Sequence, residues 1–186
     1  MDSLWKWLLF LVLSSGILYI SRASLRVPGS HGFFRFFAWE CILALFLINL
    51  DVWFQVPFSW YQIISWCLLF LSLVPLVLGI HALRTYGKPV PRRETESQLL
   101  AFEKTSALVT EGIYRTIRHP LYSSLILLTW GIFFKDLIWQ GFVLGLAATL
   151  LLVATARADE KECVRFFGDS YQAYMRHTKK FIPFIY

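Results

Sequence analysis

The sequence has few charged residues for its length, and this excludes an ordinary soluble domain. Only 16% of its 186 residues are charged, whereas 57% are hydrophobic. A soluble domain of this size cannot bury so much apolar surface, and a chain of this length suffices for one domain rather than two. The composition therefore predicts a single domain, residues 1 to 186, whose main solvent is the lipid bilayer.

Several patterns that would indicate other protein classes are missing. The three cysteines form no CxxC pair, so the sequence indicates neither a disulfide framework nor a zinc site. The four histidines are too scattered in the sequence to predict a bound metal. No GxGxxG motif follows a strand, which excludes the soluble Rossmann type of cofactor site. Any cofactor is therefore expected to bind in another way.

The apolar runs predict an all-α integral membrane fold with about five transmembrane helices. They lie at about Leu4 to Ile20, Phe33 to Leu50, Trp60 to Leu83, Leu121 to Phe134 and Leu137 to Ala156. A helix needs roughly 20 residues to cross the hydrocarbon core, and the fourth run is short. It either borrows residues from the preceding polar stretch or makes a partial crossing. We interpret the last two runs as a C-terminal helical hairpin.

The basic residues predict how these helices are oriented. Of the 18 lysines and arginines, 16 lie in three segments: the loop after the first run, the loop after the third run, and the C-terminal tail. Five spans would place all three segments on one side, and cytoplasmic loops are enriched in lysine and arginine. The sequence thus predicts a multi-pass protein with its N-terminus outside and its C-terminus in the cytoplasm. The net charge of +6 suits anionic headgroups and does not predict nucleic-acid binding.

The first apolar run has a competing interpretation as a cleaved signal peptide, because small residues lie near its end. Asp2 beside a single Lys6 is unusual for such a peptide, and the run is longer than an ordinary signal core. We therefore expect a retained first span, and three N-terminal spans within residues 1 to 83.

Two polar segments are too long and too specific to be simple connections. The loop from Arg84 to Pro120 exceeds the usual length of unstructured loops in compact domains, and its residues 96 to 109 could form a short amphipathic helix. The tail from Arg157 reads as a continuation of the fifth helix up to Gly168, followed by a second short helix with Tyr171 and Tyr174. The predicted topology brings both segments to the cytoplasmic mouth of the hairpin, as caps over an apolar bundle.

These two segments resemble one family of enzymes. The stretch "SALVTEGIYRTIRHPLYSS", followed some forty residues later by "DEKECVRFFGDSYQAYMRHTKKFIP", is similar to the integral membrane methyltransferases, the isoprenylcysteine carboxyl methyltransferase and phospholipid methyltransferase group. Order and spacing are kept over about residues 106 to 183, whereas the N-terminal half matches only as a set of spans. The resemblance implies methyl transfer from S-adenosylmethionine to a lipidic or lipid-tethered acceptor, such as an isoprenylcysteine carboxylate, at the cytoplasmic membrane face.

The resemblance also implies where the cofactor binds, namely in residues 84 to 186. Its expected contacts are Leu108, Val109, Tyr114, His119, Pro120, Leu121, Tyr122, Asp159 and Glu160. The chemistry agrees, because aromatic rings can face an adenine or a sulfonium, carboxylates can accept from ribose hydroxyls or an ammonium, and Arg115 or Arg118 can hold a carboxylate. Methyl transfer to a carboxylate or thiolate requires positioning rather than acid or base help.

The sequence departs from the family pattern at three positions. Ser106 stands where the family usually has histidine, and Asp159 stands where it usually has glutamate. The arginine thought to hold the substrate corresponds to Thr155, so Arg157 is the candidate catalytic residue, at a different place on the helix. The substrate class therefore cannot simply be transferred from the family.

Other interpretations remain open at this point. The stretch "YRTIRHPLY" could be an interfacial belt of aromatic and basic residues, and Asp159 with Glu160 could be a solvated charge cluster. Phospholipid (ethanolamine) N-methylation is an alternative reaction. An NADPH-dependent membrane reductase is another, because sterol reductases share an Arg-His-Pro-like element, and a non-enzymatic membrane scaffold is a third. The oligomeric state and the particular membrane are not predicted.

Overall fold

The computed structural model describes residues 3 to 87 and 107 to 183, and the regular structure in these residues is helical. The helices are α1 (Ser3–Leu25), α2 (His31–Ile48), α3 (Trp60–Tyr86), α4 (Pro120–Phe133), α5 (Trp139–Phe167) and α6 (Asp169–His177), with short 3₁₀ helices η1 (Leu50–Val52) and η3 (Gly112–Arg115). The predicted all-α class is confirmed, and each long helix begins within a few residues of the start of an apolar run.

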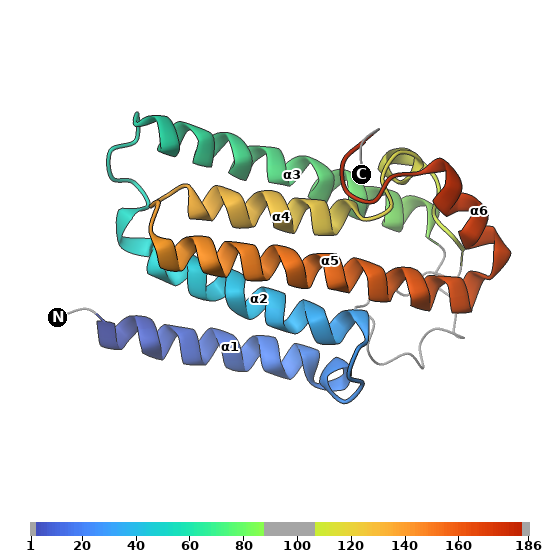
Figure 1. The fold of residues 1–186 in the computed structure, drawn as a ribbon, viewed down its shortest axis with the longest axis horizontal. Coiled ribbons are helices and arrows are strands. Elements are labelled where there is room, and N and C mark those ends of the chain that lie inside the picture. The colour runs from blue at the N-terminus through green and yellow to red at the C-terminus, as the bar shows by residue number, and fades with distance from the viewer. Residues whose placement is uncertain (1–2, 88–106, 184–186) are drawn as a thin grey trace.

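The five long helices lie side by side in an order that differs from their order in the chain. Figure 1 shows α1 at one edge of the bundle and α3 at the other. The long helices make their main contacts as α1 with α2, α2 with α5, α5 with α4, and α4 with α3, and α2 makes a smaller contact with α4. The C-terminal hairpin of α4 and α5 is therefore inserted between α2 and α3.

Four of these helices are long and apolar enough to cross a membrane: α1, α2, α3 and α5. Large apolar side chains on α1 and α3 are exposed along much of their length, as expected for surfaces that face lipid. Helix α4 has 14 residues, which corresponds to about 21 Å of helix against a hydrocarbon core of about 30 Å. The structure fits an all-α membrane protein, and the fifth crossing stays a prediction.

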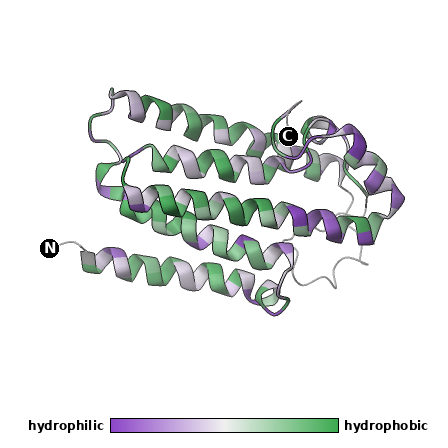
Figure 2. Cartoon of the chain, in the orientation of Figure 1, coloured by the Kyte–Doolittle hydropathy of each residue, from purple (hydrophilic) through white to green (hydrophobic). Residues whose placement is uncertain are grey.

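One end of the bundle collects most of the polar residues, and we call it the basic end. It contains the connection from α1 to α2, residues 84 to 87, residues 107 to 120, α6 and residues 157 to 183 (Figures 1 and 2). The described residues of the three basic segments recognised in the sequence lie here, as the five-run layout predicted. The apolar part of α5 ends at Ala156, and we call residues 157 to 167 the polar extension of α5.

The tail has the predicted form. Helix α5 ends at Phe167, and Gly168 adopts a positive φ of 60°, a conformation that glycine takes without steric cost. Helix α6 then carries Tyr171 and Tyr174 back along the basic end. The amphipathic helix predicted for residues 96 to 109 falls mostly outside the described residues, and residues 107 to 109 are not helical.

Glycines allow the hairpin to approach its neighbours closely. A Cβ atom on Gly141 would lie 3.3 Å from Leu45 of α2, and one on Gly131 would lie 2.9 Å from the side chain of Leu69 on α3. Small residues at helix contacts favour close packing in membranes. The "GFVLG" stretch at residues 141 to 145 therefore begins at a close contact between α5 and α2.

We expect Gly131→Ala to lower the free energy of unfolding by about 1 to 3 kcal/mol, because the added methyl overpacks the contact between α3 and α4. The matched control is Gly145→Ala, whose Cβ would lie 3.8 Å from its nearest neighbour, Thr129. That substitution should be neutral or stabilising, since alanine favours a helix interior over glycine. Thermal unfolding in detergent compares the two, and equal stability of both variants would contradict the proposed packing.

Candidate active site

The segment that leads into α4 is held against the end of α3. Val109 and Tyr114 are buried and pack with Ala82 of α3. Gly112 has a φ of 62°, and this turns the chain into η3, which places Tyr114 toward the protein. The hydroxyl of Tyr174 on α6 donates a hydrogen bond of 2.6 Å to the carbonyl of Tyr114. The loop and the tail therefore contact each other directly.

The same segment pairs with the end of the tail through its backbone. The Arg118 amide donates to the Lys179 carbonyl at 2.8 Å, the His119 amide donates to the Lys180 carbonyl at 3.1 Å, and the Lys179 amide donates to the Thr116 carbonyl at 3.0 Å. This short pairing is parallel. It fixes the Arg-His-Pro stretch beside the terminal residues, although about sixty positions separate them in the sequence.

A buried group of charges forms where these segments meet the polar extension of α5. Glu160 Oε1 accepts from Arg118 Nε at 3.0 Å and lies 3.4 Å from His119 Nε2. Glu160 Oε2 lies 2.8 Å from Lys180 Nζ. On the other side of the imidazole, His119 Nδ1 lies 3.5 Å from Asp159 Oδ2. We call these five residues the Glu160 cluster.

The two carboxylates of the Glu160 cluster differ in their solvent exposure, and hence in their accessibility to a ligand. The side chain of Glu160 is 9% exposed and already contacts three cationic groups, whereas the side chain of Asp159 is 26% exposed. The second oxygen of Asp159 accepts from the thiol of Cys163 at 3.6 Å. Glu160 therefore organises the cluster, and Asp159 presents the more accessible acceptor.

Arg118 is held in place along its whole length. Its Nη1 donates to the carbonyls of Met175 and Thr178, the first at 3.2 Å, and it lies 3.3 Å from the Thr178 hydroxyl. The guanidinium thus joins the end of α6 to Glu160. Such charge-assisted bonds in fixed geometry give a rigid cationic group.

Aromatic rings surround the charges. The His119 ring stacks on Tyr122 with centroids 5.4 Å apart and lies 6.0 Å from Phe181. The rings of Tyr171 and Tyr174 lie 5.7 Å apart on α6, and burial raises the pKa of both phenols. Both tyrosines are therefore neutral at physiological pH, with hydroxyls that can donate hydrogen bonds.

The electrostatics favour a charged His119. Burial lowers the pKa of its imidazole, but hydrogen bonds to Asp159 and Glu160 and the charges of these carboxylates outweigh burial and leave the pKa raised. In the polar extension of α5, burial raises the pKa of Glu160, but hydrogen bonds to His119 and Lys180 and their charges lower it to about 2. The cluster therefore contains ionised groups of both signs.

The raised pKa of His119 predicts how stability depends on pH. A histidine whose pKa is higher in the folded state contributes stability that is complete below its unfolded pKa of about 6.5 and is lost as the pH rises through the folded pKa. We expect the difference in melting temperature between the native chain and His119→Gln to be largest at pH 6 and to shrink toward pH 9. Thermal unfolding in detergent across this range measures it. Parallel profiles for the two proteins would contradict a charged His119.

The structure brings four of the predicted site residues together, because His119 stacks on Tyr122 and faces Asp159 and Glu160, whereas Val109 and Tyr114 pack against α3. Val109, Tyr114, His119, Pro120, Tyr122 and Glu160 are buried, and Leu108, Leu121 and Asp159 are half-buried. Arg157 is exposed on α5. Ser106 lies outside the described residues.

Sequence reasoning missed Lys180 as a member of the cluster. It was counted only among the basic residues of the tail, yet its Nζ lies 2.8 Å from Glu160. The signal that could have found it is its position, since it comes shortly before the Ile-Pro that ends the family-like tail. Because no sequence period connects residues 118 and 180, only the backbone pairing of the two segments shows their proximity.

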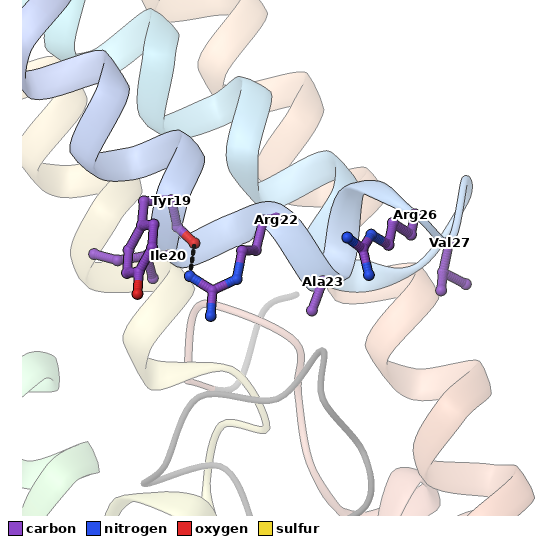
Figure 3. Close-up of a pocket in the computed structure, with 6 residues that line it drawn as sticks. All are labelled: Tyr19, Ile20, Arg22, Ala23, Arg26 and Val27. Carbon is purple, nitrogen blue, oxygen red and sulfur yellow. Dashed lines mark hydrogen bonds between the residues drawn. The ribbon is translucent and has the colours of Figure 1, made fainter.

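A separate pocket of about 520 Å³ lies at the end of α1, also on the basic end (Figure 3). Its lining residues are Tyr19, Ile20, Arg22, Ala23, Arg26 and Val27. The Arg22 guanidinium stacks over the Tyr19 ring at 4.1 Å. Aromatic, basic and apolar side chains of this kind are typical of the membrane interface, and none of them belongs to the Glu160 cluster.

Comparisons with known proteins point to one enzyme family. The family described as phospholipid methyltransferase matches residues 91–170. The chain is 34% identical over 86 residues, 44% of its length, to the protein-S-isoprenylcysteine O-methyltransferase of Schizosaccharomyces pombe, of which this match covers 35%. It is 24% identical over 74 residues, 40% of its length, to the methanethiol S-methyltransferase of Pseudomonas deceptionensis, of which this match covers 28%.

The chain therefore spans about a third of the length of the curated relatives that it matches, and no solved structure matches it. The matched region of the family, residues 91–170, includes the Arg-His-Pro stretch, the hairpin and the acidic pair. These matches, together with the apolar helices, support a relationship of the chain to the membrane methyltransferase family.

Proposed function

We propose that the chain binds S-adenosylmethionine at the Glu160 cluster and transfers its methyl group to a lipidic or lipid-tethered acceptor, such as an isoprenylcysteine carboxylate. The observation that carries this proposal is the convergence of the two family-like segments. Arg118 and His119 from one segment and Asp159 and Glu160 from the other meet in a single buried cluster, at the end of a bundle whose helices are apolar.

The donor set of the cluster suits the chemical groups of this cofactor. Asp159 offers a partly exposed carboxylate for an ammonium or ribose hydroxyls, and the stacked rings of His119 and Tyr122 are aromatic groups on which adenine could stack. The sulfonium of the cofactor could lie over the face of a tyrosine ring in the site, since aromatic rings attract cations. Arg115 is exposed in η3 and is the cation best placed to hold a ligand carboxylate, because Arg118 is engaged with Glu160.

Catalysis by this site would rest on positioning. The cofactor, when bound, supplies an electrophilic methyl group, and the residues of the chain need only align it with an acceptor. The backbone pairing of residues 116 to 119 with the tail, and the bond from Tyr174 to Tyr114, hold the walls of the site rigid. Buried His119 and Tyr122 exclude water from one side. Fixed geometry of this kind can supply a large part of the barrier reduction.

The basic end supports a cytoplasmic location of the site. Lysine and arginine are enriched in cytoplasmic loops, and the described residues of the three basic segments share the end of the bundle that carries the Glu160 cluster (Figures 1 and 2). We propose that the C-terminus is cytoplasmic and the N-terminus is outside. An acceptor held in the bilayer would then approach from the apolar helices below the cluster.

The acceptor divides the proposal further. An isoprenylcysteine carboxylate needs a cation near the methyl donor to bind it. We propose the exposed Arg157 for this role. Phospholipid amine methylation is the second candidate, favoured by the family match over residues 91–170. An amine must lose a proton in the reaction, so this acceptor would need a base near the methyl donor. Transfer of labelled methyl to each acceptor class in membranes separates the two.

Ligand binding tests the proposed function before any acceptor is known. The full chain in detergent should be stabilised against thermal unfolding by S-adenosylhomocysteine and not by NADPH, because a ligand that binds only the folded state raises its stability. Stabilisation by NADPH alone would favour the membrane reductase, and stabilisation by neither would favour the non-enzymatic scaffold.

A further inference from the structure

A buried histidine of α2 contacts the polar extension of α5. His31 is the first residue of α2, and its exposed fraction is 0%. Its backbone amide donates to Glu162 Oε1 at 2.9 Å, and its Nδ1 lies 2.6 Å from Glu162 Oε2. Both oxygens of one carboxylate therefore bind the same residue, across 131 positions of sequence.

The energetics favour this pair. The first amides of a helix lack partners inside the helix, and the positive end of the helix dipole attracts an anion. Glu162 supplies that anion at the start of α2, while a buried imidazole beside a carboxylate forms a short, charge-assisted bond. The pair should thus fix the polar extension of α5 against α2 in one orientation.

The position of Glu162 gives the pair its importance. It lies two residues after Glu160 and three after Asp159 on the polar extension of α5, so the pair and the Glu160 cluster share two turns of one helix. Burial raises the pKa of Asp159, but a hydrogen bond to His119 and the charges of His31 and His119 lower it to about 2. His31 therefore acts on Asp159 as well as on Glu162.

We propose that His31 and Glu162 form a positioning pair, which orients the polar extension of α5 so that Asp159 and Glu160 face the cofactor. This inference rests on the proposed function and extends it to the N-terminal half, which matches the family only as spans. The pair contacts neither cofactor nor substrate in this proposal. The pair acts by fixing the position of Asp159, the more accessible carboxylate of the Glu160 cluster.

The test measures the dissociation constant of S-adenosylhomocysteine by calorimetry on the full chain in detergent. His31→Ala should raise it about tenfold, the effect expected from losing one charge-assisted hydrogen bond. Glu162→Gln should have a similar effect, and the double variant should be no weaker than either single one, because the two residues act as one unit. His31→Asn, which keeps a donor near the position of Nδ1, should recover most of the affinity.

A stability control separates positioning from simple unfolding. Gly131→Ala should weaken the contact between α3 and α4, and its added methyl group would meet Leu69 rather than His31 or Glu162. The melting temperature of this variant should therefore fall, while its dissociation constant for S-adenosylhomocysteine stays unchanged. Hydrogen exchange without ligand gives a second readout: His31→Ala should speed exchange in residues 157 to 167, and Gly131→Ala should not.

The outcomes distinguish the two proposals. If the native chain binds S-adenosylhomocysteine and folded His31→Ala binds it within twofold of the native chain, the positioning pair is wrong while the proposed function stands. Equal weakening of binding by Gly131→Ala would also overturn it, as would unchanged exchange in residues 157 to 167. Failure of the native chain to bind would overturn the proposed function, and this inference with it.

Discussion

Replacement of Glu160 by glutamine should weaken the binding of S-adenosylhomocysteine by at least about 100-fold, since several charge-assisted bonds are lost at once. The two oxygens of Glu160 face Arg118 and His119 on one side and Lys180 on the other. A glutamine amide has one oxygen and one NH₂ group, so one of these cations would meet a donor in place of an acceptor. The cluster should open, and Asp159 should lose its fixed place beside His119.

Calorimetry on the full chain in detergent measures this effect, with circular dichroism as the check that the helices persist. The matched control is Glu111→Gln, because Glu111 is an exposed carboxylate just before η3 and its side chain makes no cap bond there. It should bind as the native chain does. A folded Glu160→Gln variant with native affinity would remove the Glu160 cluster from the cofactor site.

Replacement of Lys135 by alanine should lower the free energy of unfolding by about 3 to 5 kcal/mol, through a cavity and an unpaired buried polar group. Lys135 lies in the turn between α4 and α5, at the end opposite the Glu160 cluster, and is 1% exposed. Its Nζ donates to Gln62 Oε1 at 3.0 Å and lies 3.5 Å from the centroid of the Trp66 ring. Gln62 in turn donates to the Lys135 carbonyl at 3.0 Å. Alanine would leave the Oε1 atom of Gln62 without this donor, beside an empty space.

Two variants make the result interpretable. Lys135→Met keeps most of the side-chain volume and loses the ammonium group with its hydrogen bond to Gln62, so it should destabilise less than alanine does. Lys6→Ala removes a lysine at the same end, whose partner Asp51 is 60% exposed, and surface pairs of this kind contribute about 1 kcal/mol or less. Thermal unfolding in detergent compares the three. A loss for Lys135→Ala no larger than that for Lys6→Ala would contradict the buried role.

The helices were predictable because their signal is local. Each apolar run is long enough to define a helix regardless of its neighbours, and Gly168 marks the end of α5 by its own backbone conformation. The short α4 was also visible, because Lys135 and Asp136 interrupt the apolar run directly after it. The site residues of the Arg-His-Pro stretch and the acidic pair followed from their spacing in the chain, which matches one family.

The contacts among those residues were less predictable. Lys180 and Glu160 meet because residues 116 to 119 pair with residues 178 to 181, and no local pattern encodes such a pairing. His31 looked like one of several scattered histidines, yet it is buried against Glu162. Both cases depend on side chains from distant segments that share a low-dielectric interior, where each charge needs a partner.

The sequence by itself determined the membrane class, the helices, the collection of basic segments at one end and the resemblance to membrane methyltransferases, because each of these depends on composition or on short-range order. The tertiary structure decided which helices are neighbours and which charges meet. It inserted the hairpin of α4 and α5 between α2 and α3, and thereby brought His31 to Glu162. The physical reason is that helix packing in a bilayer depends on the fit of surfaces such as Gly131 against Leu69, and apolar runs of similar composition do not reveal which surfaces fit.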